Sequence, residues 1–412
     1  MSKPSIRFKD NNGDNFPDWK DNLLGNLGET YSGLSGKTSN DFGEGKPFIQ
    51  YMQVYSSKLH SKDFALVKIN DGEKQNKVQR GDIFFTISSE GPADIGMSSV
   101  MIQEQDELYL NSFCFGFRPK SLNTLFPEFS SYLFRSPSVR KDIVKLAQGS
   151  TRFNMSKNQF LKIKIKIPSF EEQQKIASFL TPFDDKINLL TKKKELLDQY
   201  KKGVMQKIFS QEIRFKDDNG NDFPDWEENI LEELIEKIID NRGKTPPIEK
   251  DGIYLIEVNA LRQLYPEYNK VNKFVSTKTY ESWFRQYLKK GDVLFSTVGQ
   301  TALCSIYNEK FKSAIAQNIV GLRFKIPYSL FMYYLLTYTK NNLKFKKIQM
   351  GAVQPSVKVS QMVKLSFSIP QVEEQKKIAD FLYLIDKKAE LVRSQIDKTK
   401  EFKKGLLQQM FV

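Results

Sequence analysis

Two short strings of the sequence combine glycine, lysine and threonine in the order found in phosphate-binding loops. Gly36-Lys37-Thr38 and Gly243-Lys244-Thr245 could each place a lysine beside a phosphate group. A complete nucleotide-binding loop also requires a glycine five positions before the second glycine. Those positions hold Tyr31 and Ile238, so the sequence does not predict a nucleotide-binding site at either string.

Other residue patterns fall short of catalysis in the same way. Thr245-Pro246-Pro247-Ile248 lacks both the amide and the aromatic residue of the motif that DNA-base methyltransferases carry, and we interpret it as a turn. The only histidine, His60, excludes a metal site built from several histidines. Asp18 and Asp225 follow prolines, as in some nucleases, but they lack an acidic-x-lysine partner. The sequence therefore predicts no catalytic residue and no metal site, and a chain that is not itself an enzyme.

Two basic tracts instead indicate contacts to a polyanion. Residues 140–166 contain eight lysines and arginines and one acid, and residues 340–364 contain six lysines and no acid. Each tract surrounds a turn of similar position, Gly149 to Asn154 and Gly351 to Ser356. Lysines on a surface supply sequence-independent contacts to phosphates, whereas arginine, amide and hydroxyl side chains contact base edges. An ordinary solvated surface remains the alternative for any one of these residues.

We predict the DNA contacts from these turns, from the Gly-Lys-Thr strings and from the loops that follow two predicted strands. The candidates in the first half are Lys37, Thr38, Thr86, Ser88, Arg152, Asn154 and Lys157. The candidates in the second half are Lys244, Thr245, Thr297, Gln300, Gln354, Ser356 and Lys358.

The elements that position these residues are predicted from an internal repeat. Residues 6–19 recur at 213–226 with 11 of 14 positions identical, and residues 167–180 recur at 369–382. Between the repeats, strand-like runs such as 82–87 and 292–297 alternate with turns and helical stretches. A period of about 200 residues predicts two copies of a domain rather than a solenoid.

The segments after Pro168 and Pro370 are the clearest helices. Each begins with two glutamates, which suit the positive end of a helix dipole, and each continues with a heptad stripe of apolar residues. We predict that the two helices pack as an antiparallel coiled coil that separates the domains, with Pro182 kinking or restarting the first helix. The alternative is that each helix lies on the core of its own domain. Four polar residues interrupt the stripes: Lys194, Lys201, Thr399 and Lys403.

Composition limits the class of protein. The chain has 412 residues, 40% of them hydrophobic, and a formal net charge of +14, which favours a globular protein that meets nucleic acid. Two distant cysteines predict neither a disulfide framework nor a zinc site. No apolar run is long enough to cross a membrane and no secretory leader is recognisable, so we expect a cytoplasmic protein without a membrane partner.

The repeated motifs resemble the specificity (S) subunits of type I restriction-modification systems. The resemblance rests on the Ile-Pro-x-x-Glu-Glu-Gln-x-Lys-Ile-Ala-x-Phe-Leu runs at 167–180 and 369–382 and on Gly81-Asp82 and Gly291-Asp292 before two strands. It also rests on the leading segments that end in Trp19 and Trp226, and it covers nearly the whole chain. One departure is the loop after Phe85, which differs from residues 297–301, so contact residues do not transfer between the halves.

The resemblance implies an α/β (α+β) fold with two target-recognition domains, each recognising one half of a split DNA site. The partners it implies are double-stranded DNA, two modification subunits docked on the helices, and restriction or motor subunits. Those partners would bind S-adenosylmethionine, ATP and Mg, and this chain would hold no cofactor. A scaffold that binds nucleic acid without sequence preference and a stand-alone nuclease are the competing hypotheses.

The expected layout has six parts. They are a leading segment (1–19), a first recognition domain (20–167), a central helix (168–212), a repeated leading segment (213–226), a second recognition domain (227–369) and a C-terminal helix (370–412).

Overall fold

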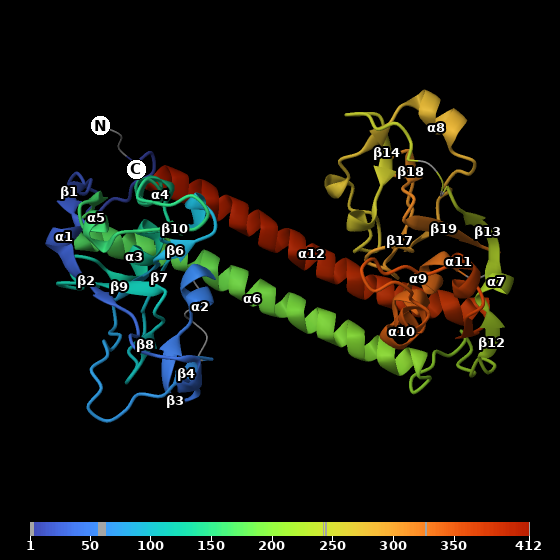
Figure 1. Ribbon diagram of the computed structural model, residues 1–412, viewed down its shortest axis with the longest axis horizontal. Helices are drawn as coiled ribbons and strands as arrows, with labels where there is room; N and C mark the ends of the chain where they lie inside the picture. Colours follow the sequence, from blue (N-terminus) through green and yellow to red (C-terminus); the bar gives the residue numbers. More distant parts are fainter. Residues whose placement is uncertain (1–3, 57–62, 242, 244, 326–327, 412) are drawn as a thin grey trace. The chain divides into compact units, whose positions relative to one another are not determined.

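The computed structural model describes residues 4–56, 63–241, 243, 245–325 and 328–411. His60 and Lys244 lie outside the described residues. The chain forms two compact units: unit 1 contains Met1–Thr191 and Ser394–Val412, and unit 2 contains Lys192–Arg393. Two long helices, α6 (Phe170–Phe209) and α12 (Val372–Met410), each contribute one half to each unit (Figure 1).

Unit 1 is built around a four-stranded antiparallel sheet in the order β2-β9-β5-β7. A three-stranded sheet in the order β4-β3-β8 lies beside it, with β3 and β8 parallel. Two-stranded pairs join β1 to β11 and β6 to β10. The strands are β1 (Lys20–Leu23), β2 (Gly28–Ser32), β3 (Phe42–Ile49), β4 (Ala65–Val67), β5 (Ile83–Thr86), β6 (Ser88–Ser89), β7 (Ser98–Val100), β8 (Tyr109–Leu110), β9 (Cys114–Pro119), β10 (Phe153–Asn154) and β11 (Lys164–Ile167). The short helices are α1 (Leu24–Leu27), α2 (Tyr51–Ser56), α3 (Pro127–Leu133), α4 (Pro137–Val144) and α5 (Lys157–Phe160).

Unit 2 repeats this arrangement. Its four-stranded sheet has the order β13-β19-β16-β17, and its three-stranded sheet has the order β15-β14-β18 with β14 and β18 parallel. A two-stranded pair joins β12 to β20. The strands are β12 (Glu227–Ile230), β13 (Ile235–Ile239), β14 (Ile253–Ile256), β15 (Phe274–Val275), β16 (Val293–Ser296), β17 (Cys304–Ile306), β18 (Ser313–Ile315), β19 (Ile319–Phe324) and β20 (Ser366–Ile369). The short helices are α7 (Leu231–Leu234), α8 (Thr277–Trp283), α9 (Ser329–Thr337), α10 (Thr339–Lys347) and α11 (Val359–Met362).

The two units therefore share strand order and strand direction in both main sheets, which confirms the prediction of two similar α+β domains. The central strands β5 and β16 are fully buried along their length. A strand that is covered on both faces has apolar side chains at successive positions. This explains the absence of alternating polar residues in Ile83-Phe84-Phe85 and Val293-Leu294-Phe295.

The core of unit 1 extends from the sheet to the long helices. The Phe85 ring lies 4.6 Å from that of Phe160 and 5.3 Å from that of Phe115. Ile176 and Leu180 of α6 belong to the same buried cluster, as do Leu406 and Met410 of α12. Each helix half thus packs on the core of its unit, which was the alternative prediction, and it also contacts the other helix.

The Gly-Asp pairs before β5 and β16 have a structural role. Gly81 and Gly291 adopt φ angles of +89° and +94°, which favour glycine. The buried carboxylate of Asp82 accepts hydrogen bonds from Arg118 at 2.7 and 2.8 Å, and Asp292 does the same with Arg323 at 2.8 and 2.9 Å. Each ion pair ties the start of the central strand to its neighbour.

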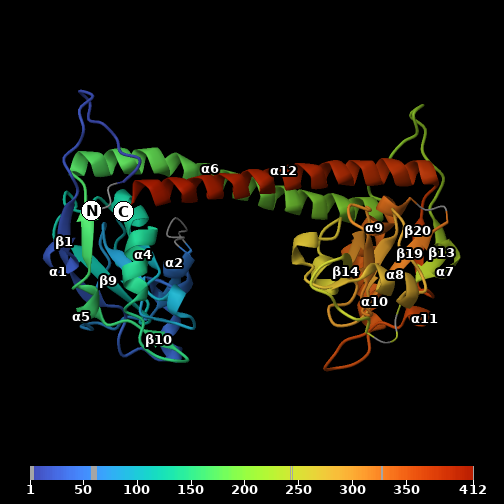
Figure 2. The ribbon, with the colours of Figure 1, turned by 90° about the horizontal axis from the view of Figure 1, so that it is seen from above.

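The Glu-Glu-Gln motifs also prove to be structural. The carboxylate of Glu172 is fully buried and accepts hydrogen bonds from Arg7 at 2.7 and 3.0 Å, which raises the pKa of the guanidinium. Glu374 and Arg214 form the same pair at 2.7 and 3.2 Å. In Figure 2 the blue leading segment of unit 1 lies beside the start of α6, where this pair holds it.

The glutamine of each motif fixes the next element. The Gln173 side chain accepts from the Phe126 N–H at 2.9 Å and donates to the Thr124 carbonyl at 3.0 Å, just before α3. The Gln375 side chain accepts from the Tyr328 N–H at 2.9 Å, just before α9. These bonds satisfy buried backbone groups that would otherwise lack a partner.

A lysine–aspartate–tyrosine cluster joins the two long helices within each unit. In unit 2, Lys201 of α6 donates to Asp386 of α12 at 2.6 and 2.8 Å, and the Tyr334 hydroxyl of α9 donates to the same carboxylate at 2.7 Å. In unit 1 the roles of the helices are exchanged: Lys403 of α12 pairs with Asp184 of α6, and Tyr132 of α3 donates to Asp184 at 2.8 Å. The N-terminal half of each helix therefore meets the C-terminal half of the other, which makes the pair antiparallel.

These clusters account for two of the polar interruptions in the heptad stripes. Lys201 and Lys403 face the partner helix because their ammonium groups pair with aspartates there. A charged pair at one position of an apolar seam favours a single register, since any shift would leave both charges unpaired.

Of the two outcomes predicted for Pro182, a restart of the helix is wrong, because α6 continues through this residue without interruption, and a kink stays a prediction. Proline removes one backbone donor, and this loss is tolerated where packing on both sides fixes the helix. Leu180 is fully buried, and the Phe183 ring lies 5.5 Å from that of Phe402 on α12. No helix among the described residues is long and apolar enough to cross a membrane.

Replacing Asp386 by alanine tests the cluster in unit 2. The change leaves the Tyr334 hydroxyl and the Lys201 ammonium without their acceptor, and we expect a loss of about 2–4 kcal/mol in the free energy of unfolding of unit 2. Urea unfolding of the full chain measures it. Asp198→Ala is the matched control, because its pair with Lys194 is exposed and should contribute less than about 1 kcal/mol. Equal losses for both variants would contradict the assigned role.

Candidate nucleic-acid interface

Two equivalent hairpins carry the turns that the sequence singled out. In unit 1, Gln148 and Asn154 exchange backbone hydrogen bonds of 3.0 and 2.8 Å. In unit 2, Met350 and Ser356 exchange two bonds of 2.8 Å. β10, which closes the first hairpin, lies at the end of unit 1 far from α6 in Figure 2. The first hairpin therefore lies away from α6 within unit 1.

Each hairpin is fixed to the loop that follows the central strand of its sheet. Asn154 pairs with Ser88 just beyond β5, and Ser356 pairs with Val298 just beyond β16. A further backbone bond joins Met155 to Ile87 at 3.0 Å, and its counterpart joins Val357 to Thr297 at 2.8 Å. The loop and the hairpin thus form one surface in each unit.

A glycine begins each turn and determines its shape. Gly149 and Gly351 have φ angles of +130° and +86°. A Cβ atom on Gly149 would overlap the carbonyl oxygen of Arg152, and one on Gly351 would lie 2.7 Å from that of Gln354. Arg152 and Gln354 therefore occupy the same place in the two hairpins, three residues after the glycine.

The predicted residues of the first half separate into exposed and buried groups. The side chains of Arg152, Asn154 and Thr38 are exposed. Lys37 is nearly buried and pairs with Glu73 at 2.6 Å, while Lys157 is half-buried and donates to the Ser32 hydroxyl at 2.7 Å.

Thr86 and Ser88 lie beneath this surface. Thr86 is fully buried, and its hydroxyl accepts a hydrogen bond from the Met97 N–H at 3.0 Å. Ser88 is buried as well, and Arg152 approaches its hydroxyl at 3.4 Å. These two positions favour a role in shaping the loop, and a direct contact with DNA stays an untested prediction for them.

The second half shows a similar separation. Gln354 and Lys358 are exposed, Ser356 is half-buried, and Thr297 is fully buried. The Gln300 side chain accepts from Arg262 at 2.9 Å, which adds an arginine to this loop. The Thr245 hydroxyl accepts from Gln317 at 3.2 Å. Lys244, the remaining candidate, lies outside the described residues.

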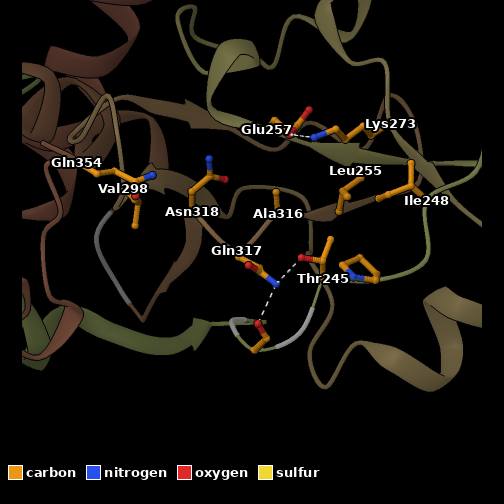
Figure 3. Close-up of a pocket in the computed structure, with 12 residues that line it drawn as sticks. Thr245, Ile248, Leu255, Glu257, Lys273, Val298, Ala316, Gln317, Asn318 and Gln354 are labelled. Atoms are coloured by element: carbon orange, nitrogen blue, oxygen red, sulfur yellow. Dashed lines mark hydrogen bonds and ion pairs between the residues drawn. The ribbon is translucent and has the colours of Figure 1, made fainter.

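A cavity of about 480 Å³ joins several of these residues in unit 2. Thr245 and Gln354 line it from two different loops, and Gln317 and Asn318 line it from the segment just before β19 (Figure 3). Lys273 and Glu257, which pair at 2.7 Å, close another side. Three lining residues, Gln317, Asn318 and Gln354, carry amide groups, which both donate and accept hydrogen bonds.

Not every basic residue of the two tracts faces solvent. Arg140 donates to the carbonyls of Gly96 and Ala93 at 2.6 and 2.8 Å, and burial lowers its pKa. Lys157, Lys166 and Lys344 are half-buried. The exposed lysines of the tracts are Lys141, Lys145, Lys162 and Lys164 in unit 1, and Lys340, Lys346, Lys347, Lys358 and Lys364 in unit 2.

The described residues hold no cluster of three or more histidine, cysteine, aspartate or glutamate side chains that could bind a metal ion. Both cysteines are buried and unpaired, and desolvation raises the pKa of the Cys114 thiol to about 12. A thiol of such high pKa is a poor nucleophile at neutral pH.

Comparison with known proteins decides the family. The model of the type I restriction modification DNA specificity domain matches residues 17–199 and 224–401. The chain belongs to this specificity-subunit family.

Its relatives agree with that assignment. The type I restriction enzyme MjaVIII specificity subunit of Methanocaldococcus jannaschii is 27% identical over 297 residues, covering 67% of this chain and 68% of the relative. A candidate type I restriction enzyme MjaX specificity subunit of the same organism is 27% identical over 419 residues, covering 95% and 92%. None of these proteins supports the alternative of a scaffold without sequence preference.

Solved structures of specificity subunits share the fold. The S subunit of M. genitalium superposes with a TM-score of 0.60 at 15% identity, covering 100% of this chain and 99% of that one. A structure concerned with complex assembly and conformational transition of the type I R-M system gives a TM-score of 0.55 at 16% identity, covering 96% and 98%.

Sequence reasoning missed three residues of this surface: Phe113, Gln317 and Asn318. They lie just before β9 and β19: Phe113 is inside the run 112–117 that we interpreted as a strand, and Gln317 and Asn318 directly precede the strand-like run 319–324. Gly116 and Arg118 match Gly321 and Arg323, and extending this alignment backwards places Phe113 opposite Asn318. That signal was available, but it needed the two halves to be aligned strand by strand.

The conformation of the first hairpin can be tested at Gly149. Alanine there cannot keep the positive φ angle without overlapping the Arg152 carbonyl, so we expect the free energy of unfolding of unit 1 to fall by about 1–3 kcal/mol. Gly405→Ala is the control in the same unit, because a Cβ there meets nothing within 4 Å and helical alanine should add about 0.5–1 kcal/mol. Chemical denaturation of both variants gives the comparison. A stable Gly149→Ala chain would show that the turn is not constrained.

Proposed function

We propose that this specificity-family chain recognises a two-part DNA sequence, with one unit for each half-site. The observation that carries the proposal is the pair of equivalent hairpins, which have the same backbone framework but different side chains at the tip. A common framework with different contact residues is what two different half-sites require. The exposed lysines beside the hairpins supply phosphate contacts, which set affinity but not sequence.

The chemistry of modification belongs to partner subunits in this proposal. Modification subunits would bind S-adenosylmethionine and methylate adenine, and restriction or motor subunits would use ATP and Mg. The buried, neutral cysteines and the structural roles of the Glu-Glu-Gln motifs support a chain that recognises DNA without catalysing a reaction. The complex would act on double-stranded DNA in the cytoplasm.

The two long helices would set the spacing of the half-sites. Each is a continuous helix of 40 or 39 residues that contributes to both units. The Lys201–Asp386 and Lys403–Asp184 ion pairs would oppose a shift of one helix along the other, since a shift would leave the charges unpaired. A fixed number of base pairs between the half-sites is the expected consequence.

Methylation mapping tests function and spacing together. DNA from cells that carry the modification subunit should show a two-part adenine motif with a constant spacer only when this chain is present. The measurement is single-molecule sequencing of genomic DNA from strains with and without the gene. Methylation at a single undivided motif, or a spacer that varies, would contradict the proposal.

Matched apolar side chains on the long helices support a docking surface for modification subunits. Leu189 and Phe402 in unit 1 are 72% and 57% exposed, and their counterparts in unit 2, Leu391 and Tyr200, are 66% and 54% exposed. Large apolar side chains with this exposure suit a helix of a partner protein. Because the same chemistry occurs once in each unit, two modification subunits would dock.

Single and double lysine substitutions test the number of docking sites. Leu189→Lys should remove one modification subunit from the purified complex, and Leu189→Lys with Leu391→Lys should remove both, because a charge in an apolar interface must be desolvated. Native mass spectrometry counts the subunits. Leu66→Lys is the control, because Leu66 is also an exposed leucine but belongs to strand β4 and not to either long helix. A double variant that retains two subunits would exclude this surface.

A further inference from the structure

Beside each hairpin there is one structurally equivalent position, and the two units have different residues there. The Ile87 N–H donates to the Phe113 carbonyl at 3.0 Å, and the Thr297 N–H donates to the Asn318 carbonyl at 2.8 Å. Since Ile87 and Thr297 also accept the matched bonds from the hairpins, Phe113 and Asn318 occupy the same place in the two units. Each therefore sits beside the tip residue of its hairpin, Arg152 or Gln354.

In unit 1 this position forms a platform for an arginine. The Phe113 ring is 55% exposed, and the guanidinium carbon of Arg152 lies 5.7 Å from its centroid. Stacking on an aromatic ring orients the planar guanidinium while leaving its edge free to donate. The Ser88 hydroxyl, at 3.4 Å, takes only a weak bond from one nitrogen. An arginine held in this way matches the two acceptors on the major-groove edge of guanine.

In unit 2 the same position holds an amide with an unused acceptor. The Oδ1 atom of Asn318 is buried and has no hydrogen-bond partner among the described residues. Gln354 lies near it on the wall of the cavity in Figure 3. A buried acceptor without a partner is uncommon in folded proteins, and a ligand or an ordered water that donates to it would satisfy it. The Oγ1 atom of Thr297, in the neighbouring loop, is a second such atom among the described residues.

The neighbouring amide cannot take that role. Gln317 already donates to the Gly243 carbonyl at 2.8 Å and to the Thr245 hydroxyl at 3.2 Å. Asn318 and Gln354 are therefore the amides available to a base. Adenine offers one donor and one acceptor on its major-groove edge, and asparagine and glutamine match that pattern.

We infer that Phe113 with Arg152 and Asn318 with Gln354 are equivalent specificity-determining pairs, the first selecting guanine and the second selecting adenine in its half-site. This inference rests on the proposed function, and it assigns the base chemistry that the function leaves open. It also gives the cavity of unit 2 a ligand, the exposed edge of a base pair.

Exchanging the pairs tests the inference directly. Asn318→Phe with Gln354→Arg places the unit 1 pair in unit 2, and one adenine of the second half-site should become guanine in the methylation map. The first half-site should stay unchanged in the same molecules. The modification complex assembled on the full chain is the material, and the preference at that base should change by roughly 10- to 100-fold.

A conservative variant distinguishes a change of specificity from misfolding of the chain. Gln354→Glu keeps the shape of the side chain but replaces its donor with an acceptor, which suits the amino group of cytosine. A new preference for cytosine at one position cannot arise from loss of structure. Lys346→Ala is the control for phosphate contacts, because it should weaken binding to all sequences equally and lower the salt dependence.

The possible results distinguish a failure of the base assignment from a failure of the proposed function. If Asn318→Ala and Gln354→Ala retain the wild-type motif at every base, the inference is overturned while a two-part wild-type motif keeps the proposed function intact. Equal loss at all bases would also overturn it, because the pair would then contact phosphates. If the wild-type chain directs no two-part methylation, the proposed function itself fails.

Discussion

Each unit depends on a carboxylate at the meeting point of three helices. Asp184 and Asp386 each accept a lysine from the other long helix and a tyrosine hydroxyl from the recognition domain. Burial and the nearby Asp386 carboxylate raise the pKa of Tyr334, so its hydroxyl stays protonated and keeps donating. The helix pair and the domain are therefore held by the same atoms, and neither can shift without breaking the other's contacts.

This constraint explains how two different recognition surfaces can share one frame. The buried ion pairs Arg7–Glu172 and Arg118–Asp82 recur as Arg214–Glu374 and Arg323–Asp292 with nearly the same distances. They fix the backbone from the helix start to the central strand. Beyond that strand the backbone bonds still match, but the side chains at the tip differ. The buried ion pairs are made by groups that are identical in the two copies, whereas the residues proposed to contact DNA lie at the tips, where the two copies differ.

Much of the fold could be predicted from the repeated strings, because they contain the residues that make these buried contacts. The Glu-Glu-Gln runs, the Gly-Asp pairs and the leading segments are similar in both copies for the same reason. The tips were only partly predictable. Arg152 and Gln354 stand out as polar residues in a turn, whereas Thr86 and Thr297 have suitable side chains but are fully buried. Residue type alone does not show which side of a strand end faces solvent.

By itself the sequence determined the duplication, the helices with their acidic first turns and the family, because each of these is recognised from short continuous strings of residues. Tertiary structure alone decided that Lys201 and Lys403 complete the helix seam. It also decided that Phe113 and Asn318 stand beside the hairpin tips. Both results depend on residues that are distant in the chain, 36 positions apart for Asn318 and Gln354 and 185 for Lys201 and Asp386. Contacts between distant strands and helices leave no periodic pattern in the sequence.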